Sequence, residues 1–146
     1  MLTRQEAPDW TIRDATEADV AAVLHVWRNT EARPSLTDNE EVIEALIKAN
    51  PGALFVADVK GKIVGAVIAT YDGWRGNIYR LAVDPDYRRR GLARALVHEA
   101  ESRLRAKGAK RISCLVESDH PWATAFWDGA GYERDPIMLR YFKNLD

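Results

Sequence analysis

The sequence has a single cysteine, no long apolar run and almost no net charge. Cys114 cannot form a disulfide within the chain, and because it lies in the apolar run 112–116 it is either a buried, unreactive thiol or a reactive nucleophile. No apolar run approaches the roughly 20 residues that a membrane-spanning helix needs. Residues 1–9 include charged side chains rather than the apolar core of a signal peptide. We therefore expect a cytoplasmic protein without a membrane partner.

The charge balance excludes a general attraction to polyanions. Lys and Arg number 21, Asp and Glu number 22, and the formal net charge is −1. Such a chain has no overall field that would draw it to a nucleic acid, so we expect no nucleic-acid partner and look for anion sites in local basic clusters. The histidines His25, His98 and His120 are scattered, and no cysteine pair or carboxylate spacing accompanies them. We therefore expect no metal site.

The length and apolar content are those of one compact domain. The chain has 146 residues, of which 47% are hydrophobic, and it contains no internal repeat or low-complexity segment. We expect a single domain over residues 1–146.

The first half of the chain alternates between helical and strand periodicity. A short strand is expected at 10–13, and a helix follows with apolar residues at 20, 23, 24 and 27. A second helix, capped by Thr37 or Asp38, should bury Val42, Ala45, Leu46 and Ala49. The β-rich runs 54–59, 63–70 and 77–83 then follow with short connections, which predicts an antiparallel meander.

The second half changes to alternating helices and strands. A helix from Gly91 to Gly108 precedes a β-rich run at 111–116, and this crossover favours parallel pairing with the run 77–83. Another helix should begin near Pro121, and a last β segment is expected at 137–142. The whole pattern predicts an α+β fold with a mixed, mainly antiparallel central sheet and helices on both faces.

The loop 84–93 is the most informative stretch for function. Its sequence, Asp-Pro-Asp-Tyr-Arg-Arg-Arg-Gly-Leu-Ala, joins a strand to a helix and places arginines and a glycine where the helix begins. A helix N-terminus has unpaired backbone N–H groups and a partial positive charge, so it binds anions. Small residues there let a phosphate approach the backbone. The stretch therefore indicates a phosphate site, and its alternative is a solvated basic turn in which Gly91 serves only the backbone conformation.

The same loop resembles that of the GNAT acetyltransferases. Their acetyl-CoA signature is Arg or Gln, two residues, Gly, one residue, then Gly or Ala, and Arg88, Gly91 and Ala93 match it. Residues 120–127 with the following Gly-Tyr are similar to the family's second motif, although His120 and Trp127 replace its usual Asn and Tyr. The turn 71–76 resembles that of the YpeA-type bacterial branch, for which the family implies no firm substrate.

The resemblance implies the GNAT fold and an N-acetyltransferase that uses acetyl-CoA as cosubstrate. An amine would attack the bound thioester directly, with no covalent acyl-enzyme. The backbone of the central strand would hold the pantetheine arm and the loop amides would hold the pyrophosphate. The residues that the resemblance assigns to acetyl-CoA are Leu81, Ala82, Val83, Arg88, Arg89, Arg90, Gly91, Leu92, Ala93, Arg94, His120 and Trp127. The position of His120 also suits a simple helix cap.

The catalytic positions depart from the family pattern. Leu115 and Trp127 stand where many members have a glutamate base and a tyrosine acid. Glu117 lies two residues after Leu115, on the same face of an extended chain, and is the substitute candidate for the base; its alternative is an exposed carboxylate at a strand end. Arg33 and Trp74 are candidates for the acceptor side, where the family places its substrate groove, or else surface residues.

Two other classes of protein compete with this hypothesis. A dinucleotide-binding Rossmann unit also places glycine at a strand-to-helix loop, but the loop lacks the spaced glycines of that unit, and meander strands precede it. A catalytically weak or inactive acyl-CoA-binding module fits the missing tyrosine and glutamate. The acceptor amine and the choice between a monomer and a homodimer stay open.

Overall fold

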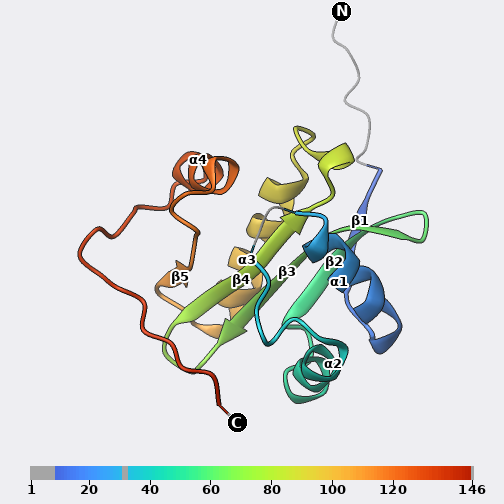
Figure 1. Cartoon of the computed structure of the whole chain (residues 1–146), viewed down its shortest axis with the longest axis horizontal. Coiled ribbons are helices and arrows are strands. Elements are labelled where there is room, and N and C mark those ends of the chain that lie inside the picture. The colour runs from blue at the N-terminus through green and yellow to red at the C-terminus, as the bar shows by residue number, and fades with distance from the viewer. Residues whose placement is uncertain (1–8, 31–32, 146) are drawn as a thin grey trace, which may run out of the picture.

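A single five-stranded sheet organises the computed structural model, which describes residues 9–30 and 33–145 (Figure 1). The strands are β1 (Thr11–Asp14), β2 (Leu54–Val59), β3 (Lys62–Tyr71), β4 (Gly76–Val83) and β5 (Ile112–Cys114), and they lie in the sheet in that order. The pairs from β1 to β4 are antiparallel, and β4 pairs with β5 in parallel. The predicted meander and the parallel crossover pair are therefore confirmed.

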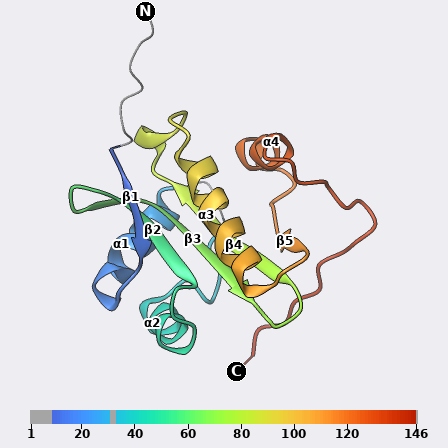
Figure 2. The same cartoon turned by 180° about the vertical axis from the view of Figure 1, so that it is seen from behind.

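Helices cover both faces of the sheet, as the sequence predicted. The helices are α1 (Val20–Arg28), α2 (Glu40–Ala49), α3 (Leu92–Lys107) and α4 (Pro121–Gly129). Helices α1 and α2 lie on one face, and α3 crosses the other face, as the view from behind shows (Figure 2). Short 3₁₀ turns, Glu17–Asp19 and Pro85–Tyr87, lead toward α1 and α3.

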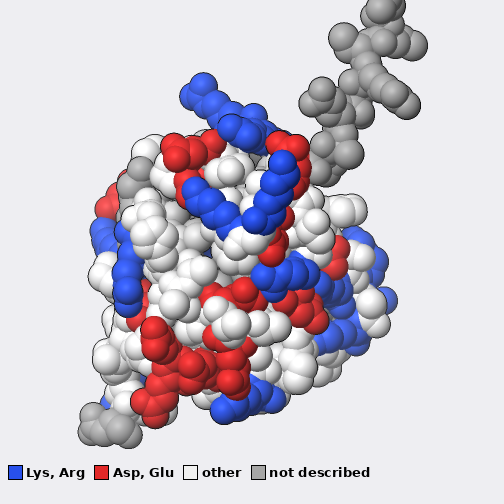
Figure 3. Space-filling model, turned by 90° about the vertical axis from the view of Figure 1, so that its right-hand side faces the viewer, with Lys and Arg blue, Asp and Glu red and all other residues white. Residues whose placement is uncertain are grey.

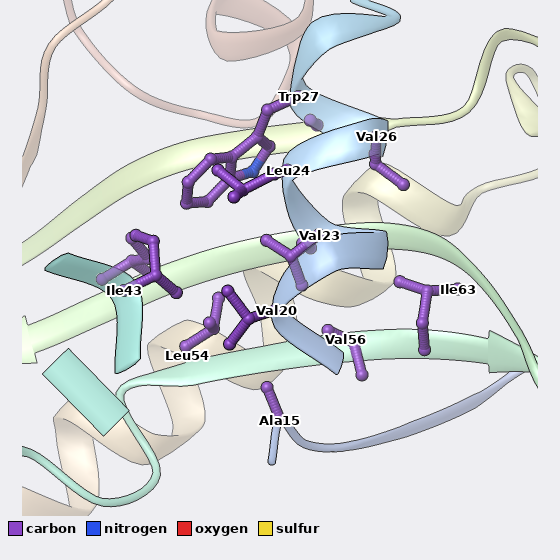
Figure 4. Packing of buried hydrophobic residues seen from close by; sticks show 13 residues of the cluster. Ala15, Val20, Val23, Leu24, Val26, Trp27, Ile43, Leu54, Val56 and Ile63 are labelled. Atoms are coloured by element: carbon purple, nitrogen blue, oxygen red, sulfur yellow. The ribbon is translucent and has the colours of Figure 1, made fainter. Parts of the chain in front are cut away.

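The strands supply side chains alternately to the cores on the two faces. Along β2, Leu54 and Val56 belong to the core under α1, whereas Phe55 and Ala57 belong to the core under α3. This alternation is the two-residue period of a strand that is buried on both sides. Figure 4 shows Val20 and Val23 of α1 lying over the first of these layers.

Four details differ from the sequence predictions. Helix α2 is capped by Asn39, whose side chain accepts the Val42 backbone N–H at 3.0 Å, and not by Thr37 or Asp38. The helix buries Ile43 and partly buries Leu46 and Ile47, while Val42 stays 39% exposed. The apolar residues of α2 could form a buried face centred on Val42 or one centred on Ile43, and the packing against α1 selects Ile43.

The third difference concerns the expected β segment at 137–142. Residues 133–145 form no strand, and Ile137, Leu139 and Tyr141 are largely exposed. A strand needs a hydrogen-bonded neighbour. Ion pairing of Arg134 with Asp128, at 2.6 Å, ties the start of this segment to α4 rather than to the sheet. The expected strand at 111–116 is also shorter, because its pairing with β4 ends at Cys114.

An ion-pair cluster joins the first strand to the start of α1. Arg13 donates to Asp19 at 2.7 Å and also contacts Asp58 at 3.1 Å. The Arg13 hydrogen bond, opposed by burial, lowers the pKa of Asp19 from 3.8 to about 2. The Asp19 side chain is only 11% exposed, which limits the screening of this pair by solvent.

The cluster makes stability sensitive to acid. A depressed carboxyl pKa stabilises the fold above the unfolded pKa, and this contribution is lost as the pH falls from about 4 to about 2. We expect the free energy of unfolding to drop by about 1–2 kcal/mol over this window from this group. Urea titrations at several pH values measure it. In Asp19→Asn, the free energy of unfolding should change much less between about pH 4 and about pH 2. If its dependence on pH were the same as in the wild type, Asp19 would not be the group responsible.

Membrane-spanning helices are absent from the part of the chain that the structure describes.

Candidate active site

The parallel strands β4 and β5 separate part of the way along the sheet. Their pairing runs only from Gly76 and Ile112 to Ile78 and Cys114. On the other side of β4, the register with β3 shifts between the pairs Ile68–Tyr79 and Ala66–Ala82, so β4 contains one extra residue there. Arg80, in this bulge, has a φ of 55°, which is uncommon for a residue other than glycine. The second half of β4 therefore has a backbone edge that β5 does not cover.

A cavity lies where the two strands separate, and we refer to it as the central cavity. Its lining comes from β4, from the end of β5 and the segment after it, and from α4, with one residue just after α1 and one from the loop before α3. The lining residues are Thr30, Ile78, Tyr79, Arg80, Leu81, Arg88, Cys114, Leu115, Val116, Glu117, His120, Trp122, Ala123 and Trp127. Figure 1 shows β5 and α4 on the side of the molecule beyond β4.

The central cavity brings together several residues that the sequence analysis singled out from distant parts of the chain. The structure places Leu81, Arg88, Glu117, His120 and Trp127 in its lining. Ala82 and Val83 follow on β4, but their side chains are buried in the cores, so only their backbone remains for a ligand.

The loop between β4 and α3 has the geometry of an anion site. Gly91 precedes α3 with a φ of 82° and no side chain caps the helix, so the first N–H groups of α3 have no partner of the kind that a capping side chain provides. A Cβ atom at Gly91 would meet nothing within 4 Å. The space above the helix N-terminus is therefore open, and glycine is favoured there by its left-handed backbone.

Basic side chains surround this opening. Arg89, Arg90 and Arg94 are exposed, while Ala93 is partly buried and Leu92 is buried in the core. Figure 3 shows Lys and Arg together with Asp and Glu toward the top of the face that it presents, and a cluster of Asp and Glu at the lower left. Three exposed arginines thus lie at this loop of a chain with almost no net charge, which is the kind of local basic cluster that an anion site needs.

His120 and its neighbours form the wall that α4 contributes. The Nδ1 atom of His120 accepts the Ala123 backbone N–H at 3.2 Å, so this residue caps α4 and its ring carries the proton on Nε2 when neutral. The ring of Trp122 stacks on Phe126, with centroids 5.6 Å apart, and the Arg88 guanidinium lies 5.1 Å from the Trp122 ring. The helix-cap reading of His120 is confirmed, and the same residue lines the central cavity.

Trp127 is held rigidly between aromatic rings. It is 8% exposed and packs edge-on against Phe126 at 5.3 Å and Tyr132 at 4.7 Å. The indole has a single N–H donor and no proton to release near neutral pH. At this position the side chain provides shape and an apolar surface, not acid chemistry.

Glu117 lines the central cavity, and its carboxylate already has a partner. Its Oε1 atom accepts the backbone N–H of Arg33 at 2.8 Å, and the Arg33 guanidinium contacts Asp119 at 2.7 Å. Glu117 and Arg33 were separate candidates from distant parts of the sequence, and the structure places them in direct contact. Trp74 lies elsewhere, 69% exposed in the β3–β4 turn with the Arg75 guanidinium 4.0 Å from its ring, and it does not line the central cavity.

Sequence reasoning missed Arg80 and Asp38, which form an ion pair beside the central cavity. The Arg80 guanidinium also donates to the Arg33 carbonyl oxygen at 3.2 Å and lies 5.6 Å from the Trp27 ring. A signal existed in the sequence, because a charged residue interrupts an otherwise mainly apolar strand at position 80. Nothing in the sequence indicated its partner.

Residues 9–30 and 33–145 contain no group of three or more His, Cys, Asp or Glu side chains placed to hold a metal ion.

Comparison with known proteins identifies the class to which this fold and cavity belong. The model of the acetyltransferase (GNAT) family matches residues 20–132, and the chain belongs to that family. A curated relative from Yersinia pestis (strain Pestoides F), named acetyltransferase, is 36% identical over 129 residues, which are 88% of this chain and 92% of that protein. The resemblance that rested on Arg88, Gly91 and Ala93 is thus confirmed at the level of the family.

Solved structures agree with the fold. Ard1 from Thermoplasma volcanium superimposes with a TM-score of 0.77 at 24% identity, covering 85% of this chain and 82% of that one. The PaiA N-acetyltransferase from Thermoplasma acidophilum, solved in complex with coenzyme A, has a TM-score of 0.77 at 16% identity, covering 88% and 92%. The predicted α+β fold of the GNAT type is confirmed.

Proposed function

We propose that this protein transfers the acetyl group of acetyl-CoA to a primary amine by direct attack within a ternary complex. The observation that carries the proposal is the position of two features at one end of the sheet. The uncovered backbone edge of β4 begins after Ile78, and the open, positively charged N-terminus of α3 follows the same strand. An extended thioester arm that ends in a pyrophosphate matches this combination of a strand edge and an anion site.

Binding of acetyl-CoA would use the backbone more than side chains. The N–H groups from Arg89 to Arg94 would hold the pyrophosphate, and the arginine side chains around them would add charge-assisted contacts. The backbone of Leu81, Ala82 and Val83 would pair with the pantetheine arm. His120 and Trp127 would contact the arm from α4, since both line the central cavity.

The reaction itself needs a neutral amine and a stabilised oxyanion. The amine nitrogen attacks the thioester carbonyl carbon, the carbon–sulfur bond breaks, and CoA leaves as a thiolate. Glu117 would take the proton from the amine, and backbone N–H groups of β4 would donate to the oxyanion. No side chain has to protonate the thiolate, because a thiol with a pKa of about 8.5 is already a good leaving group. Arg33 would lie on the acceptor side, next to Glu117.

A panel of amines tests the proposal. The purified chain is mixed with acetyl-CoA and, in turn, with peptides that have free N-termini, lysine, polyamines and small amino metabolites, and the acetylated products are identified by mass spectrometry. Acetylation of at least one class supports the proposal. Tight acetyl-CoA binding without transfer to any amine from pH 6 to 10, a range that brackets the thiol and amine titrations, would favour the acyl-CoA-binding module instead.

The pH dependence of the rate is the second expected result. The rate should rise with pH as the acceptor amine loses its proton, and it should not fall at alkaline pH, because Trp127 cannot act as a titrating acid. Initial rates from pH 6 to 10 measure this profile. A fall in the rate at alkaline pH, with the same apparent pKa for every acceptor amine, would show that an acidic group of the enzyme is essential.

Cys114 should take no part in the reaction. Burial raises the pKa of its thiol to about 11, so almost none of it is the reactive thiolate at neutral pH. Cys114→Ala should retain the transfer rate within about threefold, since direct attack by the amine needs no enzyme nucleophile. Iodoacetamide labelling at pH 8 should likewise be slow. A large loss of activity in a variant of unchanged stability would indicate an acetyl-cysteine intermediate.

A further inference from the structure

The segment 33–38 between α1 and α2 bridges the two sides of the central cavity. On one side, Arg80 of β4 pairs with Asp38 and donates to the Arg33 carbonyl oxygen at 3.2 Å. On the other side, Arg33 donates its backbone N–H to Glu117 at 2.8 Å and contacts Asp119 at 2.7 Å. We call this stretch the bridging segment. It connects the bulge of β4 to the loop before α4.

The Asp38 carboxylate organises the end of the bridging segment that faces β4. It accepts the Ser35 backbone N–H at 3.0 Å, and the Asp38 backbone N–H in turn donates to the Ser35 carbonyl oxygen at 3.0 Å. These two hydrogen bonds close the turn 35–38. The Asp38 oxygen that accepts the Ser35 N–H also accepts a hydrogen bond from the Arg80 guanidinium. A fixed Arg80 side chain therefore also fixes the position of the turn 35–38, through Asp38.

Arg80 is itself well fixed. The bulge of β4 sets its backbone at a φ of 55°, and its guanidinium lies 5.6 Å from the ring of Trp27, which is 4% exposed. Such backbone conformations persist only where the surrounding structure determines them, and they concentrate at functional sites.

The two anchors differ in how strongly solvent competes with them. The side chains of Arg80 and Asp38 are 21% and 15% exposed, whereas those of Arg33 and Asp119 are 72% and 66% exposed. Water and salt screen an exposed pair so that it contributes little, while a shielded pair is costly to break. The contacts of Arg33 with Asp119 and Glu117 should therefore break far more often than the Arg80–Asp38 ion pair.

We propose that Arg80 is a positioning residue for the acceptor side: it keeps the turn 35–38 in place while the Arg33 end of the bridging segment releases Glu117 to admit the amine. The inference rests on the proposed function. Only Oε1 of Glu117 accepts the Arg33 N–H, so release of this contact leaves both carboxylate oxygens open to the amine and its proton. Arg80 touches neither the thioester nor the transferred proton. Its role is to limit the motion to one end of the segment.

Amide hydrogen exchange, followed by NMR, tests the positioning directly. In Arg80→Met the Ser35 and Asp38 amides should exchange about tenfold faster or more, because their turn loses its shielded anchor. In Asp119→Asn the Arg33 amide should exchange faster while Asp38 stays as in the wild type. Arg75→Met is the matched control, since Arg75 also lies over a tryptophan but outside the central cavity. Arg80→Lys should be intermediate, because an ammonium group lacks the planar fork that contacts both the Asp38 carboxylate and the Arg33 carbonyl oxygen.

Kinetics separate positioning from cofactor binding. Arg80→Met should raise the acceptor KM by about tenfold and leave the acetyl-CoA affinity within twofold, as expected for a change confined to the acceptor side. Unchanged exchange at Ser35 and Asp38 would overturn the proposal, and so would a matching loss of acetyl-CoA affinity. Asp38→Asn replaces Arg80→Met if that variant does not fold. If the wild type acetylates no amine, the proposed function fails, and the exchange data still decide whether Arg80 holds the turn.

Discussion

Replacing Gly91 with aspartate should weaken acetyl-CoA binding by about 100-fold or more, since placing like charges together at an interface costs several kcal/mol. The physical reason is local. The new carboxylate would stand at the N-terminus of α3, where the helix dipole and its free N–H groups attract the pyrophosphate. Because a Cβ at this position meets nothing within 4 Å, the protein should still fold. Calorimetric titration with acetyl-CoA measures the change.

Gly61→Asp is the matched control for Gly91→Asp. Gly61 also has a left-handed backbone, with a φ of 92°, and a Cβ there would also meet nothing within 4 Å, but it lies in the β2–β3 turn. Both variants therefore carry the same conformational strain and the same added charge. Only Gly91→Asp should lose affinity. Equal affinity in the two folded variants would show that the phosphates bind away from α3.

Glu117→Gln should lower kcat/KM for the acceptor amine by roughly 100-fold near neutral pH, within the range that a general base contributes. The amide keeps an oxygen that accepts the Arg33 N–H, so the contact at 2.8 Å survives while the proton acceptor is lost. The defect should shrink as the pH approaches the pKa of the amine, because solvent then supplies the neutral nucleophile. Steady-state rates at several pH values measure both effects.

Glu117→Ala separates the chemical role from the structural one. Alanine removes the base and also releases the Arg33 N–H, so any further loss beyond the glutamine variant reports on the bridging segment. A glutamine variant with wild-type kcat/KM at every pH would exclude Glu117 as the base. The residue would then serve only to hold Arg33.

Much of this fold was predictable because local patterns determine it. The short connections between the runs 54–59, 63–70 and 77–83 allow only neighbouring antiparallel strands, and the crossover through a helix requires a parallel fifth strand. The loop proposed to hold the pyrophosphate could be singled out for the same reason, since the strand, the loop with Gly91 and the helix are consecutive in the chain. Family membership followed from these contiguous residues.

The predictions that failed were those that depend on packing between elements. The apolar face of α2 could be centred on Val42 or on Ile43, and only contact with α1 places Ile43 in the core. The residues 137–142 have strand-like composition, yet they have no partner strand in the described structure. Whether such a segment pairs is decided by an edge elsewhere in the molecule, which no local pattern reveals.

The sequence by itself therefore determined the order of the elements, the family and the loop that would hold a phosphate. Only the tertiary structure decided which residues lie together at the proposed acceptor side, because Arg33, Arg80 and Glu117 come from three separate segments. Their contacts span 47 and 84 positions of the chain. Local propensities carry no information across such separations, whereas folding brings the segments together when both faces of the sheet are buried.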